Sequence, residues 1–144
     1  MALIVQKFGG SSVANADRVR NVARIITETY RKGHSVVVVL SAQGDTTDDL
    51  IAKAAEINPH ASKREMDMLL ATGEQISISL CAMAIEAMGY QVVSLTGWQA
   101  GVNTDSAYGG RASSASRLSA SRPSWISERL CWWLASRALT SMAT

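Results

Sequence analysis

The residues that offer the clearest chemistry lie in the stretch VQKFGGSSV near the N-terminus. Lys7 provides a full positive charge, and Gly9 and Gly10 let the backbone turn sharply and approach a ligand closely. The hydroxyls of Ser11 and Ser12, with the amides at the expected start of a helix, add hydrogen-bond donors. This combination suits a phosphate group. The same residues also fit a plain tight turn with a solvated lysine, and the stretch alone does not decide between the two.

The order of these residues differs from two common phosphate-binding motifs. In a Walker loop the lysine follows the glycines, whereas here it precedes them, and the G-x-G-x-x-G order of dinucleotide-binding folds is missing. The stretch therefore predicts neither a P-loop nor a dinucleotide fold.

The elements around this stretch predict a strand, a helix and a second strand. Residues 3–8 form a short apolar run that ends at two glycines, which favours a buried strand. Asn15 can cap a helix whose apolar residues recur at helical spacing until Gly33. The run SVVVVL, residues 35–40, is almost wholly β-branched, as in a parallel sheet that is covered on both faces. The order predicts a right-handed βαβ unit.

The rest of the first 109 residues continues this alternation. A loop with the sequence SAQGDTTDD leads into a helix over residues 48–56, and a long helix follows over 63–88, with Gly73 as a weak point and Gly89 as the stop. A third strand is expected at 91–95. The pattern predicts an α/β fold, a three-layer sandwich with a mainly parallel sheet that is incomplete in this chain. Ligands of such sheets bind beyond the carboxyl ends of the strands, so KFGGSS, SAQGDTT and TGWQAG are expected at one rim.

Several other side chains have structural interpretations. Asp45, Asp48 and Asp49 follow the pattern of a capping acidic turn, and no residue is assigned as a metal ligand. Four methionines at helical positions are expected to fill the core: Met66, Met68, Met83 and Met88.

The overall composition is that of a globular domain, but the first 109 residues and the last 35 differ in composition. Of the 144 residues, 47% are hydrophobic and 18% are charged. Residues 1–109 hold 9 basic and 11 acidic residues, whereas 110–144 hold 5 arginines and one acid. The second part is also dense in serine and tryptophan. We therefore predict a boundary near 109, with 110–144 a divergent tail outside the native fold.

The remaining features concern compartment and partners. The N-terminus lacks a basic segment ahead of its apolar run, and no apolar run of membrane-spanning length is evident, so the expected compartment is the cytoplasm and no membrane partner is expected. Cys81 and Cys131 lie far apart without metal-ligand spacing. No nucleic-acid partner is expected, because the basic excess is confined to the tail.

Four motifs together carry a resemblance to a known family. KFGGSSV, VVVVLSAQGDTTDDL, REMDMLLATGEQISISL and VVSLTGWQAGVNT occur in this order over residues 1–109. The segment resembles the N-terminal part of the aspartokinases, within the amino-acid kinase family.

The resemblance implies an activity and a set of site residues. The activity is transfer of a phosphoryl group from ATP, with Mg²⁺, to the side-chain carboxylate of L-aspartate, which gives 4-phospho-L-aspartate on the way to lysine, threonine and methionine. It also implies a homo-oligomer for the full-length family. Because the nucleophile is already an anion, the chemistry requires charge stabilisation and positioning more than a general base. By the resemblance, the phosphate cradle consists of Lys7, which is also the catalytic cation, with Phe8, Gly9, Gly10, Ser11 and Ser41. Thr47 and Glu74 match the aspartate-binding positions.

The tail departs from the family pattern after Gly110. We interpret it as the product of a reading-frame shift, because codons compatible with residues 130–144 read Val-Leu-Val-Val-Gly-Phe-Gln-Gly at a two-base offset. A basic interfacial helix around Trp133 is the alternative. On either interpretation the chain is a truncated fragment that is expected to be inactive in isolation. Two further alternatives are a related kinase with another acceptor and a non-catalytic fragment that binds a kinase subunit.

Overall fold

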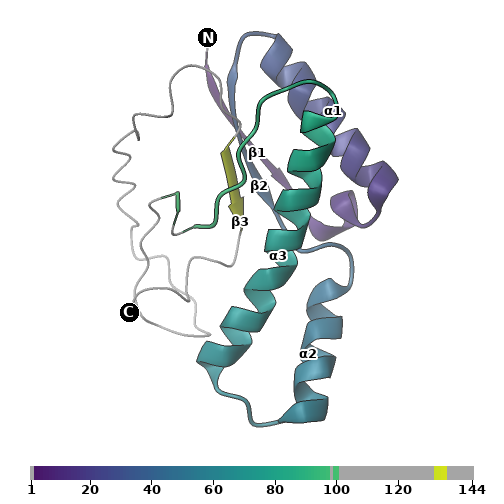
Figure 1. The fold of residues 1–144 in the computed structure, drawn as a ribbon, viewed down its shortest axis with the longest axis vertical. Coiled ribbons are helices and arrows are strands. Elements are labelled where there is room, and N and C mark those ends of the chain that lie inside the picture. Colours follow the sequence, from purple (N-terminus) through teal and green to yellow (C-terminus); the bar gives the residue numbers. More distant parts are fainter. Residues whose placement is uncertain (1, 98, 101–131, 136–144) are drawn as a thin grey trace.

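The computed structural model describes residues 2–97, 99–100 and 132–135. In chain order the elements are β1 (Leu3–Phe8), the short 3-10 helix η1 (Gly10–Val13), α1 (Ala16–Arg31), β2 (Ser35–Leu40), α2 (Thr46–Ile57), α3 (Lys63–Glu86) and β3 (Trp132–Ala135). Figure 1 shows α1 and α3 beside the sheet, and α2 extending below the ends of the strands next to α3.

The sheet is parallel and has the order β1-β2-β3. Leu3 is paired with Ser35 and Phe8 with Leu40, so the first two strands start and end together. On the other edge of β2, Val37 is paired with Trp132 and Leu40 with Ala135. The α/β fold with a parallel sheet is therefore confirmed.

The ends of the helices follow the sequence signals. The side chain of Asn15 accepts a hydrogen bond from the amide of Arg18 at 3.0 Å and caps α1, as predicted. Gly33 and Gly89 have φ values of +85° and +83°, a conformation that glycine adopts at little cost at the end of a helix. Glycine at these two positions thus fixes where α1 stops and where the chain turns after α3.

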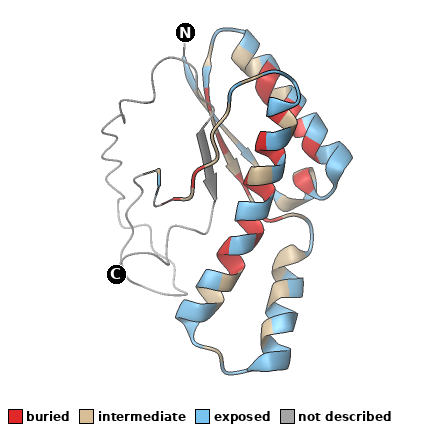
Figure 2. Cartoon of the chain, viewed as in Figure 1, coloured by how far each residue is buried: buried red, intermediate tan, exposed pale blue. Residues whose placement is uncertain are grey.

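The core lies between one face of the sheet and the helices α1 and α3. Val36, Val38 and Leu40 of β2 are fully buried at this face. They pack with buried residues of α1, among them Val22 and Ile26, and with Ile78, Cys81 and Ile85 of α3. Figure 2 shows the buried residues gathered along these two helices, whereas α2 has none. The apolar periodicity of α1 is explained by this contact.

The opposite face of the sheet is exposed in the part of the chain that the structure describes. Because alternate residues of a strand point to opposite faces, Leu3, Val5 and Lys7 share this side. Leu3 is 66% and Val5 is 64% exposed. We call Leu3, Val5, Val37 and Val39 the outer sheet face. Parallel sheets are ordinarily covered on both faces. Within the described residues, the predicted sandwich therefore lacks the layer that would cover this face.

The prediction of a third strand at 91–95 is wrong. Residues 90–96 have no regular secondary structure, although Leu95 is buried and Val92 packs against the core. The two edges of β2 are occupied by β1 and β3, and this segment is not paired with either of the outer strands, so the composition of a strand did not by itself supply a pairing partner. The tail segment 132–135 thus pairs with β2 in the structure, while the proposed boundary near residue 109 and the frame-shift origin of the tail remain predictions.

The prediction that the methionines fill the core is wrong for three of the four. Met68, Met83 and Met88 are 43%, 61% and 39% exposed, and Met66 is half-buried. Helix α3 is also long and apolar enough, by length and composition alone, to cross a membrane, and half of its apolar window is buried inside the fold. The packing of Ile78, Cys81 and Ile85 against the sheet and α1 gives α3 the character of a core helix with one exposed apolar side.

Candidate functional site

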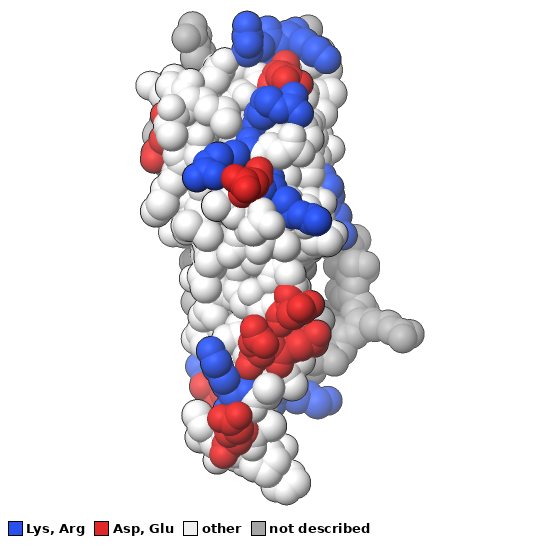
Figure 3. All heavy atoms as spheres, turned by 90° about the vertical axis from the view of Figure 1, so that its right-hand side faces the viewer, with Lys and Arg blue, Asp and Glu red and all other residues white. Residues whose placement is uncertain are grey.

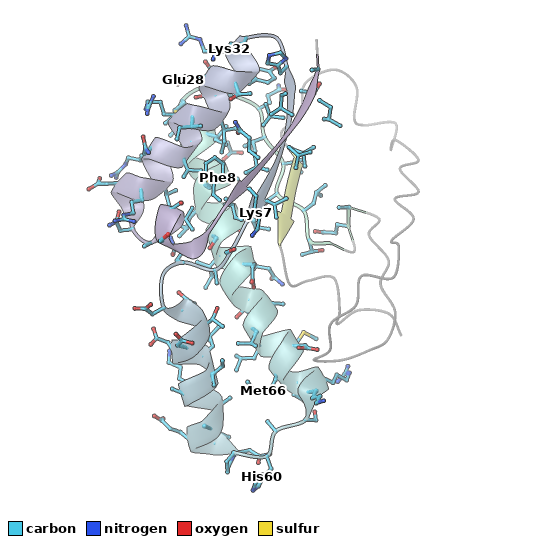
Figure 4. The ribbon with its side chains drawn as sticks, turned by 180° about the vertical axis from the view of Figure 1, so that it is seen from behind. Lys7, Phe8, Glu28, Lys32, His60 and Met66 are labelled. Atoms are coloured by element: carbon cyan, nitrogen blue, oxygen red, sulfur yellow. The ribbon has the colours of Figure 1, made fainter. Side chains whose placement is uncertain are left out.

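The candidate phosphate-binding corner lies at the carboxyl end of β1. Lys7 is exposed there, and Figure 4 shows it near the end of the strand with Phe8 beside it. Phe8 is half-buried and packs against the hydrophobic core, so it anchors the carboxyl end of the strand. Gly9 and Ser11 are exposed and Gly10 is half-buried. The corner therefore presents a cation, a hydroxyl and accessible backbone at one point.

A short 3-10 helix separates the glycines from α1. The four residues of η1 come first, and α1 begins only at Ala16. The amide of Ser12 donates to the carbonyl of Gly9 at 3.0 Å, and the guanidinium of Arg18 donates to the carbonyl of Ser11. The donors at the corner are thus Lys7, the hydroxyl of Ser11 and a few turn amides, and the dipole of a long helix does not start there.

Backbone contacts join this corner to the loop after β2. The amide of Ser41 donates to the carbonyl of Phe8 at 3.2 Å, and the amide of Gly44 donates to the carbonyl of Gly10 at 3.1 Å. The side chain of Gln43 donates through Nε2 to the carbonyl of Val13 at 2.7 Å. The sequence prediction that KFGGSS and SAQGDTT share one rim is confirmed by the first two of these hydrogen bonds, and the third joins the second loop to the adjacent Val13.

The two glycines at the corner have different structural roles. A Cβ added at Gly10 would lie 2.5 Å from the carbonyl oxygen of Ala42, a distance that side chains do not tolerate. A Cβ at Gly9 would meet nothing within 4 Å, and the φ of −77° there suits any residue. The fold requires glycine at position 10, whereas the space beside Gly9 is open.

This difference gives a matched pair of variants. We expect Gly10→Ala to lower the free energy of unfolding of the 144-residue chain by about 1–3 kcal/mol, because the loop at Ala42 must move away. Gly9→Ala should leave that free energy unchanged or raise it by up to about 1 kcal/mol. Urea unfolding followed by circular dichroism measures both values. Equal destabilisation by the two substitutions would contradict the assignment.

The predicted substrate residues lie on the two helices below the strand ends. Glu74 of α3 is only 3% exposed, and Thr47 is half-buried in the first turn of α2. A Cβ at Gly73 would lie 3.4 Å from Cγ2 of Thr46, so α3 approaches the start of α2 closely at this point. The two helices approach closely at Thr46 and Gly73, and Thr47 and Glu74 are the next residues along the chain.

The third loop expected at the rim, TGWQAG (residues 96–101), makes no hydrogen bond to the other two loops among the described residues. Its turn is closed on itself, because the amide of Ala100 donates to the carbonyl of Thr96 at 2.9 Å and Gln99 accepts from the amide of Thr96 at 2.9 Å. Among the residues that the structure describes, no hydrogen bond joins this turn to the two other loops. The remainder of the loop TGWQAG, residues 98 and 101, lies outside the described residues.

Ala42 is a positioning residue that the sequence analysis missed. Its carbonyl oxygen faces Gly10, and its Cβ would lie 3.0 Å from a Cβ at Gly73. The loop after β2 is thus held between the corner after β1 and the middle of α3. The available signal was Gly73 itself, because a glycine inside a long helix usually has a packing reason.

The charged side chains around the site come mainly from Lys7, Glu74 and the arginines and acids of α1. Two of the four arginines of α1 are paired with acids of the same helix, Arg20 with Asp17 at 2.8 Å and Arg24 with Glu28 at 2.5 Å. Figure 3 shows basic and acidic side chains interleaved on one face of the molecule. No group of three metal-ligating side chains occurs within the described ranges. The site offers a cation and hydroxyls at one loop and a buried carboxylate on α3.

Known proteins are similar to this chain in sequence and in fold. The family model described as the amino acid kinase family matches residues 2–124. Aspartokinase of Geobacillus stearothermophilus is 56% identical over 109 residues, which are 76% of this chain and 27% of the relative, and aspartokinase 2 of Bacillus subtilis is 54% identical over 109 residues, with the same coverage. The chain thus spans about a quarter of these curated relatives.

Two solved structures show the same arrangement. Aspartate kinase from Synechocystis superposes with a TM-score of 0.75 at 35% identity, covering 99% of this chain and 24% of that one. Aspartokinase III of E. coli, solved in complex with aspartate and ADP, superposes with a TM-score of 0.61 at 21% identity, covering 73% of this chain and 33% of that one. The second likeness shows the fold alone. Together with the match over residues 2–124, these likenesses establish that the chain belongs to the amino acid kinase family.

Proposed function

We propose that this chain is the N-terminal part of an aspartate kinase, which transfers the terminal phosphoryl group of ATP to the side-chain carboxylate of L-aspartate. The product, 4-phospho-L-aspartate, is the entry to lysine, threonine and methionine synthesis. The single observation that carries the proposal is the joined corner, in which Gly10 contacts the loop after β2 and that loop contacts Gly73, next to Glu74. This arrangement supports a nucleotide site and an acceptor site that meet at one rim.

On the nucleotide side, Lys7 and the backbone at Gly9 have the leading roles. The two reacting groups are both anions, so the reaction needs a cation near the transferring phosphoryl group. Lys7 supplies this charge, and Phe8, Gly10, Ser11 and Ser41 complete the proposed cradle. The open space beside Gly9 supports close approach of a phosphate to the main chain, because the fold itself does not require glycine there.

On the acceptor side, Glu74 and Thr47 hold the amino acid. The carboxylate of Glu74 binds the ammonium group of aspartate in a charge-assisted hydrogen bond, which fixes which carboxylate of the substrate faces the phosphate. Thr47 donates its hydroxyl to a substrate oxygen. The burial of Glu74 strengthens this interaction, since the water that would compete for the carboxylate is excluded.

The wider context of the proposal follows from the family. Mg²⁺ would accompany the nucleotide and would supply further positive charge beside its phosphates. The full-length protein is proposed to be a cytoplasmic homo-oligomer. The isolated 144-residue chain is proposed to be inactive, because it spans only about a quarter of its curated relatives.

A chimera tests the proposed function. Residues 1–109 replace the corresponding segment of Bacillus subtilis aspartokinase 2, which is 54% identical over 109 residues. We expect ATP-dependent formation of an acyl phosphate that hydroxylamine traps, with L-aspartate as the acceptor. A parallel assay with glutamate, acetylglutamate, carbamate and uridylate tests the alternative of a related kinase with another acceptor. A folded chimera that phosphorylates none of these compounds, or one that prefers another acceptor, would contradict the assignment.

A further inference from the structure

The loop after β2 is attached to the corner after β1 by a side chain as well as by its backbone. Gln43 is half-buried in this loop, and its Nε2 donates to the carbonyl of Val13 at 2.7 Å. Val13 is the last residue of η1 and is fully buried. The last carbonyls of a helix have no partner inside the helix, and a buried carbonyl needs a donor from elsewhere in the fold. Gln43 supplies this donor, and the proposed function gives Gln43 no role.

The backbone carbonyls of the corner are held by the protein itself. Each carbonyl from Phe8 to Ser11 accepts a hydrogen bond from another part of the chain. In chain order, the donors are the amides of Ser41, Ser12 and Gly44 and the guanidinium of Arg18. Two of these donors, Ser41 and Gly44, belong to the loop that contains Gln43. The loop therefore fixes the carbonyls of Phe8 and Gly10.

The amides of the same stretch are available to a ligand. Within the part of the chain that the structure describes, the amides of Gly9, Gly10 and Ser11 donate no hydrogen bond. In a trans peptide unit the carbonyl and the N–H point in opposite directions. Because the loop holds the carbonyls of Phe8 and Gly10, it turns the amides of Gly9 and Ser11 away from itself. Successive amides that point to one side form a concave site for an anion.

The position of the loop thus decides which end of each peptide dipole a phosphate meets. If the loop moved, the carbonyls of Phe8 and Gly10 would be free to turn toward the phosphate and repel it. Gly44 has a φ of +45°, a conformation that glycine adopts readily, and its amide donates to the carbonyl of Gly10 at 3.1 Å. Gln43 is the adjacent residue, so its bond to Val13 determines where the amide of Gly44 lies.

We propose that Gln43 is a positioning residue of the phosphate site, which acts through the loop after β2 and the amides of Gly9 and Ser11 without touching the ligand. This role rests on the proposed function, because it concerns the same corner. The contacts lie within residues 7–44, so they can be tested in the 144-residue chain. Inorganic triphosphate is the probe, since the amides face the phosphate groups and not the nucleoside.

NMR spectroscopy of the isotope-labelled 144-residue chain tests the role with Gln43→Met, which keeps the length of the side chain and removes the donor. We expect the amides of Ser41 and Gly44 to exchange with solvent at least about 10-fold faster in this variant. The dissociation constant for triphosphate, followed through the amide resonances of Gly9, Gly10 and Ser11, should rise by about 10-fold.

The matched control is the same substitution at the other half-buried glutamine of this layer, Gln6→Met. Gln6 donates through Nε2 to Oγ1 of Thr29 at 2.9 Å, a bond that joins β1 to α1 away from the loop. Its loss should leave both the exchange at Ser41 and Gly44 and the triphosphate affinity unchanged. Circular dichroism confirms that each variant is folded.

The outcomes separate this role from the kinase activity. Unchanged exchange at Gly44 in Gln43→Met, an unchanged dissociation constant, an equal rise in Gln6→Met, or no triphosphate binding by the folded parent chain would each overturn the role of Gln43. A chimera that phosphorylates aspartate would leave the kinase proposal standing in all four cases. Conversely, the expected losses in Gln43→Met together with a chimera that phosphorylates no acceptor would reject the kinase activity and keep the role of Gln43 at a phosphate site.

Discussion

Replacing Lys7 with alanine in the chimera is expected to lower kcat for aspartate phosphorylation by about 10²–10³-fold. The substitution removes the only cation that β1 places at the corner, at a point where negative charge spreads over the transferring group. Because this charge is greatest in the transition state, kcat should fall more than the KM for aspartate rises. Steady-state kinetics with the hydroxylamine trap measures both parameters.

Two controls accompany the Lys7 variant. Lys32→Ala removes an exposed cation at the end of α1, away from the corner, and should leave kcat unchanged. Lys7→Arg keeps the charge but alters its shape and should recover part of the rate. If Lys7→Ala retained full turnover, or if Lys32→Ala reduced it equally, the assignment of Lys7 would be wrong.

Replacing Glu74 with glutamine is expected to raise the KM for aspartate by about 10- to 100-fold. Glutamine has nearly the same size as glutamate, so the packing against Thr46 and Ala42 near Gly73 is kept while the charge that binds the substrate ammonium is lost. The interaction exists in the bound ground state as well as in the transition state, so kcat should change far less than KM.

The control for the Glu74 variant is Glu56→Gln, which removes an exposed acid from α2. Its KM for aspartate should equal that of the parent chimera. A Glu74→Gln chimera whose KM is unchanged and whose kcat collapses would indicate that Glu74 supports the fold or the chemistry instead of holding the substrate. Thermal unfolding of both variants distinguishes loss of structure from loss of binding.

The first half of the fold could be predicted from the sequence because each local signal agrees with its tertiary role. The cap at Asn15 satisfies a backbone donor of α1, and the apolar periodicity of the same helix matches the surface of β2. The β-branched run of 35–40 needs neighbours on both sides, and it has strands on both edges. Where local preference and tertiary packing favour the same structure, sequence patterns are sufficient to predict the element.

The third strand could not be predicted because strand formation depends on a partner that local sequence does not reveal. Gln91–Leu95 has the composition of a strand, yet β3 occupies the available edge of β2. The segment 132–135 falls within the stretch whose shifted reading frame would give Val-Leu-Val-Val. The coding DNA decides this question, because codons that cannot yield this string would end the frame-shift interpretation.

The candidate site residues could be proposed from the sequence, but the contacts that bring their loops together could not. Lys7, Gly9 and Gly10 were identifiable from residue type and order, because glycine and lysine beside a strand end have a limited set of uses. The role of Ala42 was not, since alanine has no functional group and acts only through its position between Gly10 and Gly73. The exposed methionines of α3 were misassigned for a similar reason, because helical spacing alone does not tell which side of a helix faces the core.

Isothermal titration calorimetry of the chimera with ATP tests most directly whether the corner after β1 holds the triphosphate. We expect saturable binding, an affinity at least about 10-fold weaker for Lys7→Ala, and a similar loss for Gly9→Ala without any loss of folding stability. Binding that is absent in the folded parent chimera, or an affinity that is the same in the parent and in both variants, would contradict this expectation.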